Sequence, residues 1–172
     1  MKLKTFSRAL FALLIILWAF PAYADSSAAS VVSDLTGPLI LAGELSLYYS
    51  GTNGRQEAVD GAKALFATAA ITELLKHTVH EKRLESNEDD SFPSAHTAVV
   101  FAMATTLADY QPDIKWAAYG TASAIGWSRV EEREHRWRDV IAGALIGHYV
   151  ARHFTGSHVA ITPGGLAYQT VW

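Results

Sequence analysis

The division of the apolar residues into short runs is the feature that most constrains what this chain can fold into. Hydrophobic residues make up 50% of the sequence, which raises the question of a membrane-spanning bundle. After the first 24 residues, however, charged residues interrupt the runs 35–49 and 59–75, and the charge-free runs 116–127 and 140–150 are short. A helix of about 12 residues is about 18 Å long, whereas the hydrocarbon core of a membrane is about 30 Å thick. The run lengths therefore predict soluble or membrane-peripheral helices rather than a transmembrane bundle.

Good helix formers spaced for one buried face, with turn residues between the segments, predict a mainly α, single-domain bundle of about five helices. The tail differs, because short alternating segments flank the turn signal Thr162-Pro163-Gly164-Gly165, and we expect a small hairpin or an extended strap there. The expected helices are a first one that ends at the turn Gly51–Gly54, then about 56–80, a segment that begins near Ser94, about 113–127 and about 136–154.

The first 24 residues have the layout of a cleavable signal peptide. Basic residues are followed by the apolar run 9–20 and by the small-residue ending Ala22-Tyr23-Ala24. The run is shorter than the roughly 20 apolar residues that a spanning helix needs. We therefore expect residues 1–24 to be removed, the protein to be exported to the periplasm, and residues 25–172 to form one domain.

Cysteine content and charge exclude several classes of protein. The chain has no cysteine, so it has no disulfide framework and no thiolate metal site. Its formal net charge is −3, and removal of the basic leader leaves a more acidic chain. Because nucleic-acid-binding proteins carry basic surfaces that meet the phosphate backbone, the charge argues against a nucleic-acid partner.

A histidine and an aspartate stand four residues apart at the head of the last predicted helix. At this spacing His135 and Asp139 project from the same helix face, one turn apart. A carboxylate that accepts from one ring nitrogen leaves the other nitrogen with a free lone pair, which a nucleophile or a base needs. By itself the pair is a common feature of helix surfaces, and it gains weight only beside the segments described next.

The segment Phe92-Pro93-Ser94-Ala95-His96 precedes a long apolar helix and is typical of a helix start. Unpaired backbone N–H groups and the positive end of the helix dipole can hold an oxyanion there. His96 lies beside that position, where a protonated imidazole could act as a general acid. Taken alone, this segment could equally well be an ordinary serine-capped helix start with a partly exposed histidine and no function.

Three basic residues complete the set of candidate functional residues. Lys76 and Arg83 bracket the end of the second predicted long helix, and Arg129 precedes the last one. A bound phosphate has several charged oxygens, and forked arginine donors with a lysine point charge are the expected complement. Each basic residue taken singly could equally be a solvated surface charge.

Taken together, these residues resemble the three-part signature of the superfamily of type 2 phosphatidic acid phosphatases (PAP2) and vanadium haloperoxidases. The chain carries Lys76-(six residues)-Arg83, then Pro93–His96, then Ser128-Arg129-(five residues)-His135-(three residues)-Asp139. The order and the internal spacing both agree with the family. The resemblance implies that residues 25–172 form a PAP2-like phosphatase domain with the helical fold of acid phosphatases and haloperoxidases.

The resemblance also implies a role for each residue. His135 would attack phosphorus to form a phosphohistidine, Asp139 would orient it, and His96 would protonate the leaving oxygen. The implied scheme uses no metal and no cofactor. The implied phosphate-binding residues are Lys76, Arg83, Ser94, the backbone N–H of Ala95, and Arg129.

Two positions depart from the family pattern. The family usually has proline where Leu84 stands and glycine where Ala95 stands. Leu84 loses a rigid turn and no chemistry. If the second position demanded a positive φ, Ala95 would be strained and the anion pocket would be displaced.

The sequence supports one leading hypothesis for function and leaves several alternatives. The leading hypothesis is an exported, metal-independent phosphatase that acts on phosphomonoesters or pyrophosphates, with lipid phosphates such as phosphatidic acid favoured and peripheral membrane association expected. The alternatives are a broad-specificity soluble periplasmic acid phosphatase, a vanadate-dependent haloperoxidase, and a phosphate-binding protein without turnover. A metal site at Glu73, His77 and His80, which share one helix face, is a further alternative.

Overall fold

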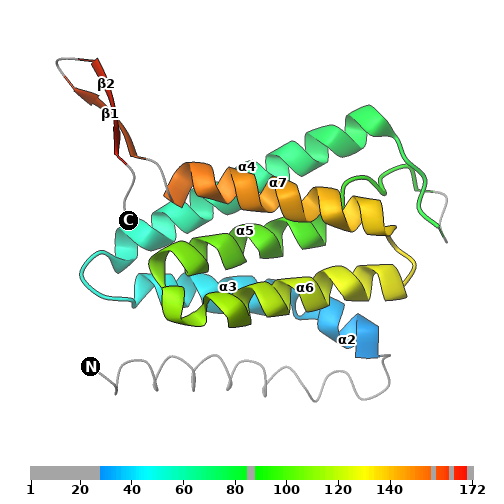
Figure 1. The fold of residues 1–172 in the computed structure, drawn as a ribbon. Coiled ribbons are helices and arrows are strands. Elements are labelled where there is room, and N and C mark those ends of the chain that lie inside the picture. The colour runs from blue at the N-terminus through cyan, green and yellow to red at the C-terminus, as the bar shows by residue number, and fades with distance from the viewer. Residues whose placement is uncertain (1–27, 85–87, 156–157, 163–164, 170–172) are drawn as a thin grey trace.

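The computed structural model describes residues 28–84, 88–155, 158–162 and 165–169, and most of them are helical. The predicted bundle is confirmed (Figure 1), and the predicted signal peptide lies outside the described residues. A short helix that we did not expect, α2 (Ala28–Asp34), precedes the bundle, and a 3-10 turn, η2 (Pro112–Ile114), joins two of its members. The bundle consists of α3 (Thr36–Tyr48), α4 (Gly54–Val79), α5 (Ala95–Tyr110), α6 (Lys115–Glu131) and α7 (Trp137–Thr155).

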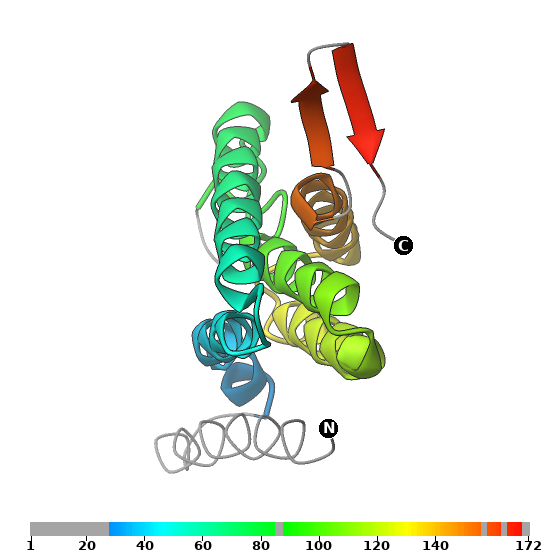
Figure 2. The ribbon, with the colours of Figure 1, turned by 90° about the vertical axis from the view of Figure 1, so that its left-hand side faces the viewer.

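Helix α5 lies at the centre of the bundle. It packs against α3, α4, α6 and α7, and the end-on view in Figure 2 shows it between α4, α6 and α7. Small and apolar residues dominate its sequence, so that Ala98 and Ala102 are buried on the side of α7 and Ala104 on the side of α6. Because such side chains let neighbouring helices approach closely, α5 can be surrounded by the rest of the fold.

Two glycines of α7 bring it into backbone contact with α5. A Cβ atom on Gly143 would lie 2.5 Å from the carbonyl oxygen of Ser94, and one on Gly147 would lie 2.0 Å from that of Ala98. Both distances are far below van der Waals contact, so only glycine fits at these points. The two helices are therefore held together along the turns that carry the predicted catalytic residues.

The C-terminal segment forms a hairpin, which was one of the two structures predicted for it, the other being an extended strap. Strands β1 (His158–Thr162) and β2 (Gly165–Gln169) pair antiparallel, with His158 opposite Gln169. The hairpin follows α7 and projects away from the bundle in Figure 1.

One helical segment is longer and more apolar than the run lengths predicted. The stretch Ala28–Tyr48, which covers α2 and α3, is 21 residues long, and by length and composition it could cross a membrane. The run predicted from the sequence begins at Leu35 and is interrupted by Glu44. It does not include helix α2, which extends the apolar segment toward the N-terminus.

Candidate active site

His135 and Asp139 lie side by side at the start of α7, as predicted. His135 precedes the helix and is 1% exposed, and its backbone N–H donates to the carbonyl of Arg129 at 3.1 Å. Asp139 lies in the first turn and is fully buried. The Nδ1 atom of His135 is 3.9 Å from Oδ2 of Asp139, which is longer than a hydrogen bond. The carboxylate thus faces the Nδ1 side of the ring, and the pair needs only a small adjustment to make the bond.

Ser91 is a buried residue of this site that the sequence reasoning missed. Its Oγ donates to Oδ2 of Asp139 at 2.7 Å, and the same oxygen accepts the backbone N–H of Arg136 at 2.9 Å. The backbone N–H of Ser91 is itself fixed by a 2.8 Å bond to the carbonyl of Glu81. These bonds hold the carboxylate in place. The signal in the sequence was a hydroxyl residue directly ahead of the Phe92–His96 segment.

The Phe92–His96 segment forms the start of α5, as predicted. Ser94 occupies the N-cap position of α5 without a capping hydrogen bond from its side chain, and its backbone N–H donates to the carbonyl of Asp139 at 3.0 Å. This bond ties the start of α5 directly to the start of α7. Ala95 is the first residue of α5, and the positive φ values of described non-glycine residues fall at His80 and Arg133. Alanine therefore occupies the usual glycine position without backbone strain.

Three carboxylates that the sequence reasoning did not single out pair with the three basic residues. Asp90 accepts from Nζ of Lys76 at 3.0 Å and from Nε of Arg83 at 2.6 Å. Glu134 accepts from Nη1 of Arg83, and Glu132 accepts from Nη1 of Arg129 at 2.7 Å. Lys76 and Arg129 are buried. The predicted phosphate-binding side chains from α4, the following loop and α6 thus converge next to His135.

Burial and nearby positive charge lower the pKa values of both histidines. Burial lowers the pKa of His135 to about 4, and the positive charges of Arg129 and Arg83 add to the effect. Desolvation lowers the pKa of His96 in the same direction, helped by the positive charges of Arg129, Lys76 and Arg83, although the residue as a whole is exposed. His135 is therefore neutral near pH 7, as a nucleophile must be. An anion bound among the basic residues would favour protonation of His96.

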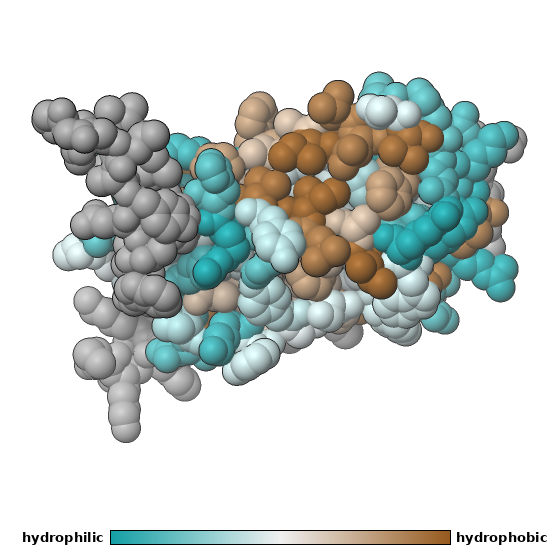
Figure 3. Space-filling view, turned by 45° about the horizontal axis from the view of Figure 1, so that its top comes forward, coloured by the Kyte–Doolittle hydropathy of each residue, from teal (hydrophilic) through white to brown (hydrophobic). Residues whose placement is uncertain are grey.

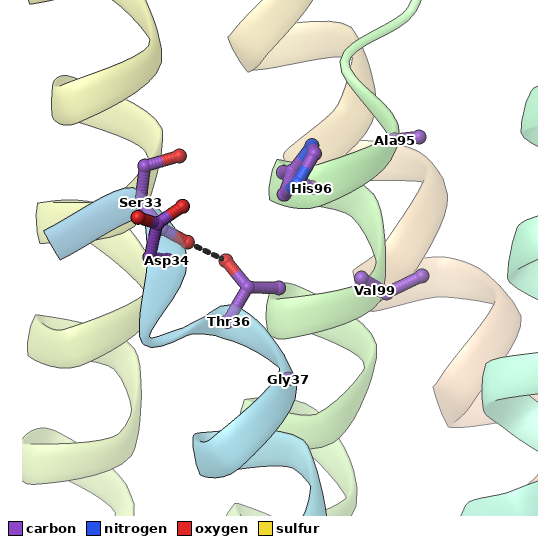
Figure 4. Close-up of a pocket in the computed structure, with 7 residues that line it drawn as sticks. All are labelled: Ser33, Asp34, Thr36, Gly37, Ala95, His96 and Val99. Atoms are coloured by element: carbon purple, nitrogen blue, oxygen red, sulfur yellow. Dashed lines mark hydrogen bonds between the residues drawn. The ribbon is translucent and has the colours of Figure 1, made fainter. Parts of the chain in front are cut away.

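A cavity of about 400 Å³ opens beside His96, at the corner where α2 meets α3. Figure 4 shows Ser33 and Asp34 facing His96 across this space. Ser33 also links the corner to the basic residues, because its Oγ accepts from Nη1 of Arg129 at 2.6 Å. The rest of the lining comes from Thr36, Gly37, Ala95 and Val99.

The structure does not assemble the alternative metal site. Nδ1 of His77 lies 3.4 Å from a carboxylate oxygen of Glu73, and both side chains are exposed. His80 follows the helix in a left-handed conformation. Among the described residues, no group of three histidine, aspartate or glutamate side chains is placed to hold a metal ion. Leu84, the second departure from the family pattern, is also exposed, and it contributes no group to the site.

Comparison with known sequences finds the same family that the motifs resemble. The family model of the PAP2 superfamily matches residues 70–162. A lipid A 1-phosphatase of Porphyromonas gingivalis is 30% identical over 116 residues, which cover 62% of this chain and 26% of that protein. Lipid phosphate phosphatase 1 of Arabidopsis thaliana is 38% identical over 89 residues, which cover 42% of this chain and 27% of that protein. The chain thus spans about a quarter of the length of these relatives.

Solved structures share the fold over most of their length. The crystal structure of LpxE from Aquifex aeolicus superposes with a TM-score of 0.58 at 22% identity, covering 84% of this chain and 85% of that one. A transmembrane PAP2-type phosphatidylglycerolphosphate phosphatase from Bacillus subtilis gives a TM-score of 0.55 at 19% identity, covering 89% and 94%. The helical bundle is therefore the fold of these two phosphatases.

Proposed function

Because this chain belongs to the PAP2 superfamily, we propose that it is a phosphatase that hydrolyses phosphate esters or pyrophosphates of lipids through a phosphohistidine at His135. The observation that carries the proposal is a buried histidine with a strongly lowered pKa, next to three converging basic residues. A neutral imidazole beside an anion site is the arrangement that attack on phosphorus needs. The named activities of the lipid A and lipid phosphate phosphatases support the same reaction class.

The reaction divides into two displacements. Since the Asp139 carboxylate faces Nδ1 of His135, Nε2 is the attacking atom. The new P–N bond forms as the ester P–O bond breaks, and His96 gives its proton to the departing oxygen. Water, deprotonated by His96, then attacks phosphorus, the P–N bond breaks, and inorganic phosphate leaves. Both histidines return to their starting states.

The basic residues stabilise the charge that the phosphoryl group carries in both steps. Arg83 and Arg129 approach from different elements with forked donors, and Lys76 adds a point charge. The first turn of α5 adds the backbone N–H of Ala95, which needs no side-chain charge. A bound phosphate takes over donors that Asp90 and Glu134 use in this structure. Preorganised donors of this kind supply the largest electrostatic part of such catalysis.

An exposed apolar face supports a lipid substrate met at a membrane surface. Figure 3 shows apolar side chains gathered over the side of the molecule where α4 and α7 lie. The predicted signal peptide, residues 1–24, would bring this face to the periplasmic membrane. On α7 the exposed apolar residues recur every four positions and begin next to His135. The exposed large apolar residues of the two helices are Val59, Phe66, Ile71, Leu74, Val79, Trp137, Ile141, Leu145 and Tyr149.

The proposal is tested by trapping the covalent intermediate. The full chain, in detergent micelles, is incubated with a radiolabelled phosphate ester and quenched in alkali, because phosphohistidine is labile in acid. We expect label on the wild-type protein, and a loss of turnover by about three orders of magnitude or more in His135→Ala. Asp139→Asn should retain partial activity, since it changes the orientation of the ring and not the attacking atom.

The matched control is His77→Ala, which removes an exposed histidine on α4 and should leave turnover unchanged. Hydrolysis at the wild-type rate by a folded His135→Ala protein would refute the mechanism. Absence of hydrolysis by the wild-type protein with every phosphate ester and pyrophosphate would refute the proposed function itself.

A further inference from the structure

The cavity at the corner of α2 and α3 lies where the leaving group must go. In an in-line displacement the attacking and leaving atoms stand on opposite sides of phosphorus. His135 attacks from the α7 side, and His96, which protonates the leaving oxygen, lines the corner cavity. His135 does not line it. The leaving group therefore departs from the anion site into the space between His96 and the corner.

The walls of this cavity are small and polar on the corner side. Ser33 and Thr36 are buried, and a 2.6 Å bond from Oγ1 of Thr36 to the carbonyl of Ser33 fixes the corner (Figure 4). Gly37 adds no side chain. Asp34 supplies the formal negative charge of the lining, and its carboxylate is exposed. Such a wall can accept hydrogen bonds from hydroxyl or ammonium groups. The Asp34 carboxylate repels an anion there, against the attraction of Arg129, which bonds to Ser33 of the same wall.

We propose that the cavity is the leaving-group subsite of the enzyme, and that Asp34 selects a neutral or cationic leaving group, such as a polyol, a sugar or an amino alcohol, over an anionic one. The inference rests on the proposed phosphatase function. It distinguishes monoesters from diphosphates, the two substrate classes on which the proposed reaction could act. In a monoester the leaving group is an alcohol, whereas in a diphosphate it is a phosphate ester that carries negative charge. The enzyme is thus a monoesterase by virtue of a residue outside the family signature.

The test needs substrates that differ in the charge of the leaving group and do not depend on acid catalysis. Asp34 also helps to keep His96 protonated, so an alkyl alcohol would confound the two effects. An aryl phosphate and an alkyl diphosphate both have good leaving groups, which depart with little help from an acid. The measured quantity is the ratio of their kcat/KM values, aryl phosphate over diphosphate.

We expect the wild-type protein to favour the aryl phosphate. Asp34→Asn should lower the ratio by about five- to tenfold, because it removes one repulsive charge beside the leaving group, and Asp34→Lys should lower it further. The matched control is Asp113→Asn, which removes an exposed carboxylate on η2 and should leave the ratio within twofold of the wild-type value.

Three results would overturn the inference while leaving the phosphatase function intact. They are a wild-type preference for the diphosphate, a ratio that neither Asp34 variant changes in active protein, and an equal change in the Asp113→Asn control. A wild-type protein that hydrolyses neither substrate, nor any lipid phosphate, would instead remove the proposed function on which the inference rests.

Discussion

His135 is buried beside positive charge, and this has a direct consequence for the dependence of activity on pH. Its pKa is lowered to about 4 in the folded protein, against about 6.5 for an unperturbed histidine. A lowered pKa means that the folded state binds this proton less tightly than the unfolded state. The neutral, nucleophilic form therefore persists as the pH falls through 6.5 and is lost only as it falls through about 4.

We predict that kcat/KM, corrected for the second ionisation of the substrate phosphate, falls on the acid side with a midpoint near pH 4. The high-pH limb belongs to His96, whose lowered pKa restricts the protonated acid to acidic conditions. Activity is thus expected to be greatest below pH 7. The measurement is a pH profile between pH 3.5 and 8 with a soluble alkyl phosphate, whose poor leaving group depends on the acid. An acid limb centred near 6.5 would contradict the burial and charge argument for His135.

At the scale of single residues, the sequence could supply the candidate reacting groups, whose chemical roles stay predictions, but not the groups that hold them in place. The spacing of Lys76, Arg83 and His135 is recognisable because it repeats a family pattern. Ser91 and Asp90 lie in the segment between α4 and α5, whose path follows no helical or strand periodicity. Their contacts depend on where this segment crosses α7, which only the assembled fold determines.

At the scale of the helices, the contact between α5 and α7 sets the geometry of the site. Ser94 and Asp139 belong to the starts of these two helices and are joined by a backbone hydrogen bond. The helices can approach so closely because Gly143 and Gly147 present no side chain to α5. The hydrophobic pattern predicted both helices well, because it indicates which face of each helix is buried. It does not indicate that one face of α7 lies against the backbone of α5.

We predict that Gly147→Ala destabilises the protein, because the new methyl group would overlap the carbonyl oxygen of Ala98. The expected loss is about 2–3 kcal/mol in the free energy of unfolding, the range found for overpacked interiors. Gly120→Ala on α6 is the matched control. Nothing lies within 4 Å of its added Cβ, so it should stabilise the helix by about 0.5–1 kcal/mol.

Chemical denaturation of both variants in detergent measures the two values. Equal stability of Gly147→Ala and the wild-type protein would show that α5 and α7 are farther apart than described here.

At the scale of the whole molecule, a strongly apolar exterior distinguishes this chain from an ordinary small soluble domain. Large apolar side chains are exposed on α4 and α7, and the stretch Ala28–Tyr48 could cross a membrane by length and composition. The positions of the charged residues along the sequence did not predict this apolar exterior. Charged residues such as Asp60 are paired within the bundle, where Asp60 accepts from Tyr110 and Lys63, and they do not divide the outer surface.

The apolar face is expected to matter for long-chain substrates and not for soluble ones. The double variant Ile141→Glu/Leu145→Glu places two charges on the exposed stripe of α7. We predict that it lowers kcat/KM for a long-chain lipid phosphate in mixed micelles about tenfold or more, since burying a charge in an apolar phase is costly. The value for a short-chain analogue should not change.

Thr52→Glu, in the exposed turn between α3 and α4, is the control and should behave as the wild-type protein with both substrates. Equal efficiency of the wild-type protein on long and short chains would indicate a broad-specificity phosphatase that acts on soluble substrates.

The carboxylates of Asp90 and Glu134 make the site resemble an ion exchanger. Three basic side chains brought together in a mostly buried place would repel one another, and the chain supplies the counter-ions that hold them there. In the proposed mechanism, an arriving phosphate takes over hydrogen-bond donors that these carboxylates occupy, and the carboxylates accept from them again when phosphate leaves. The cost of bringing the positive charges together then falls on folding, and each turnover exchanges one anionic acceptor for another.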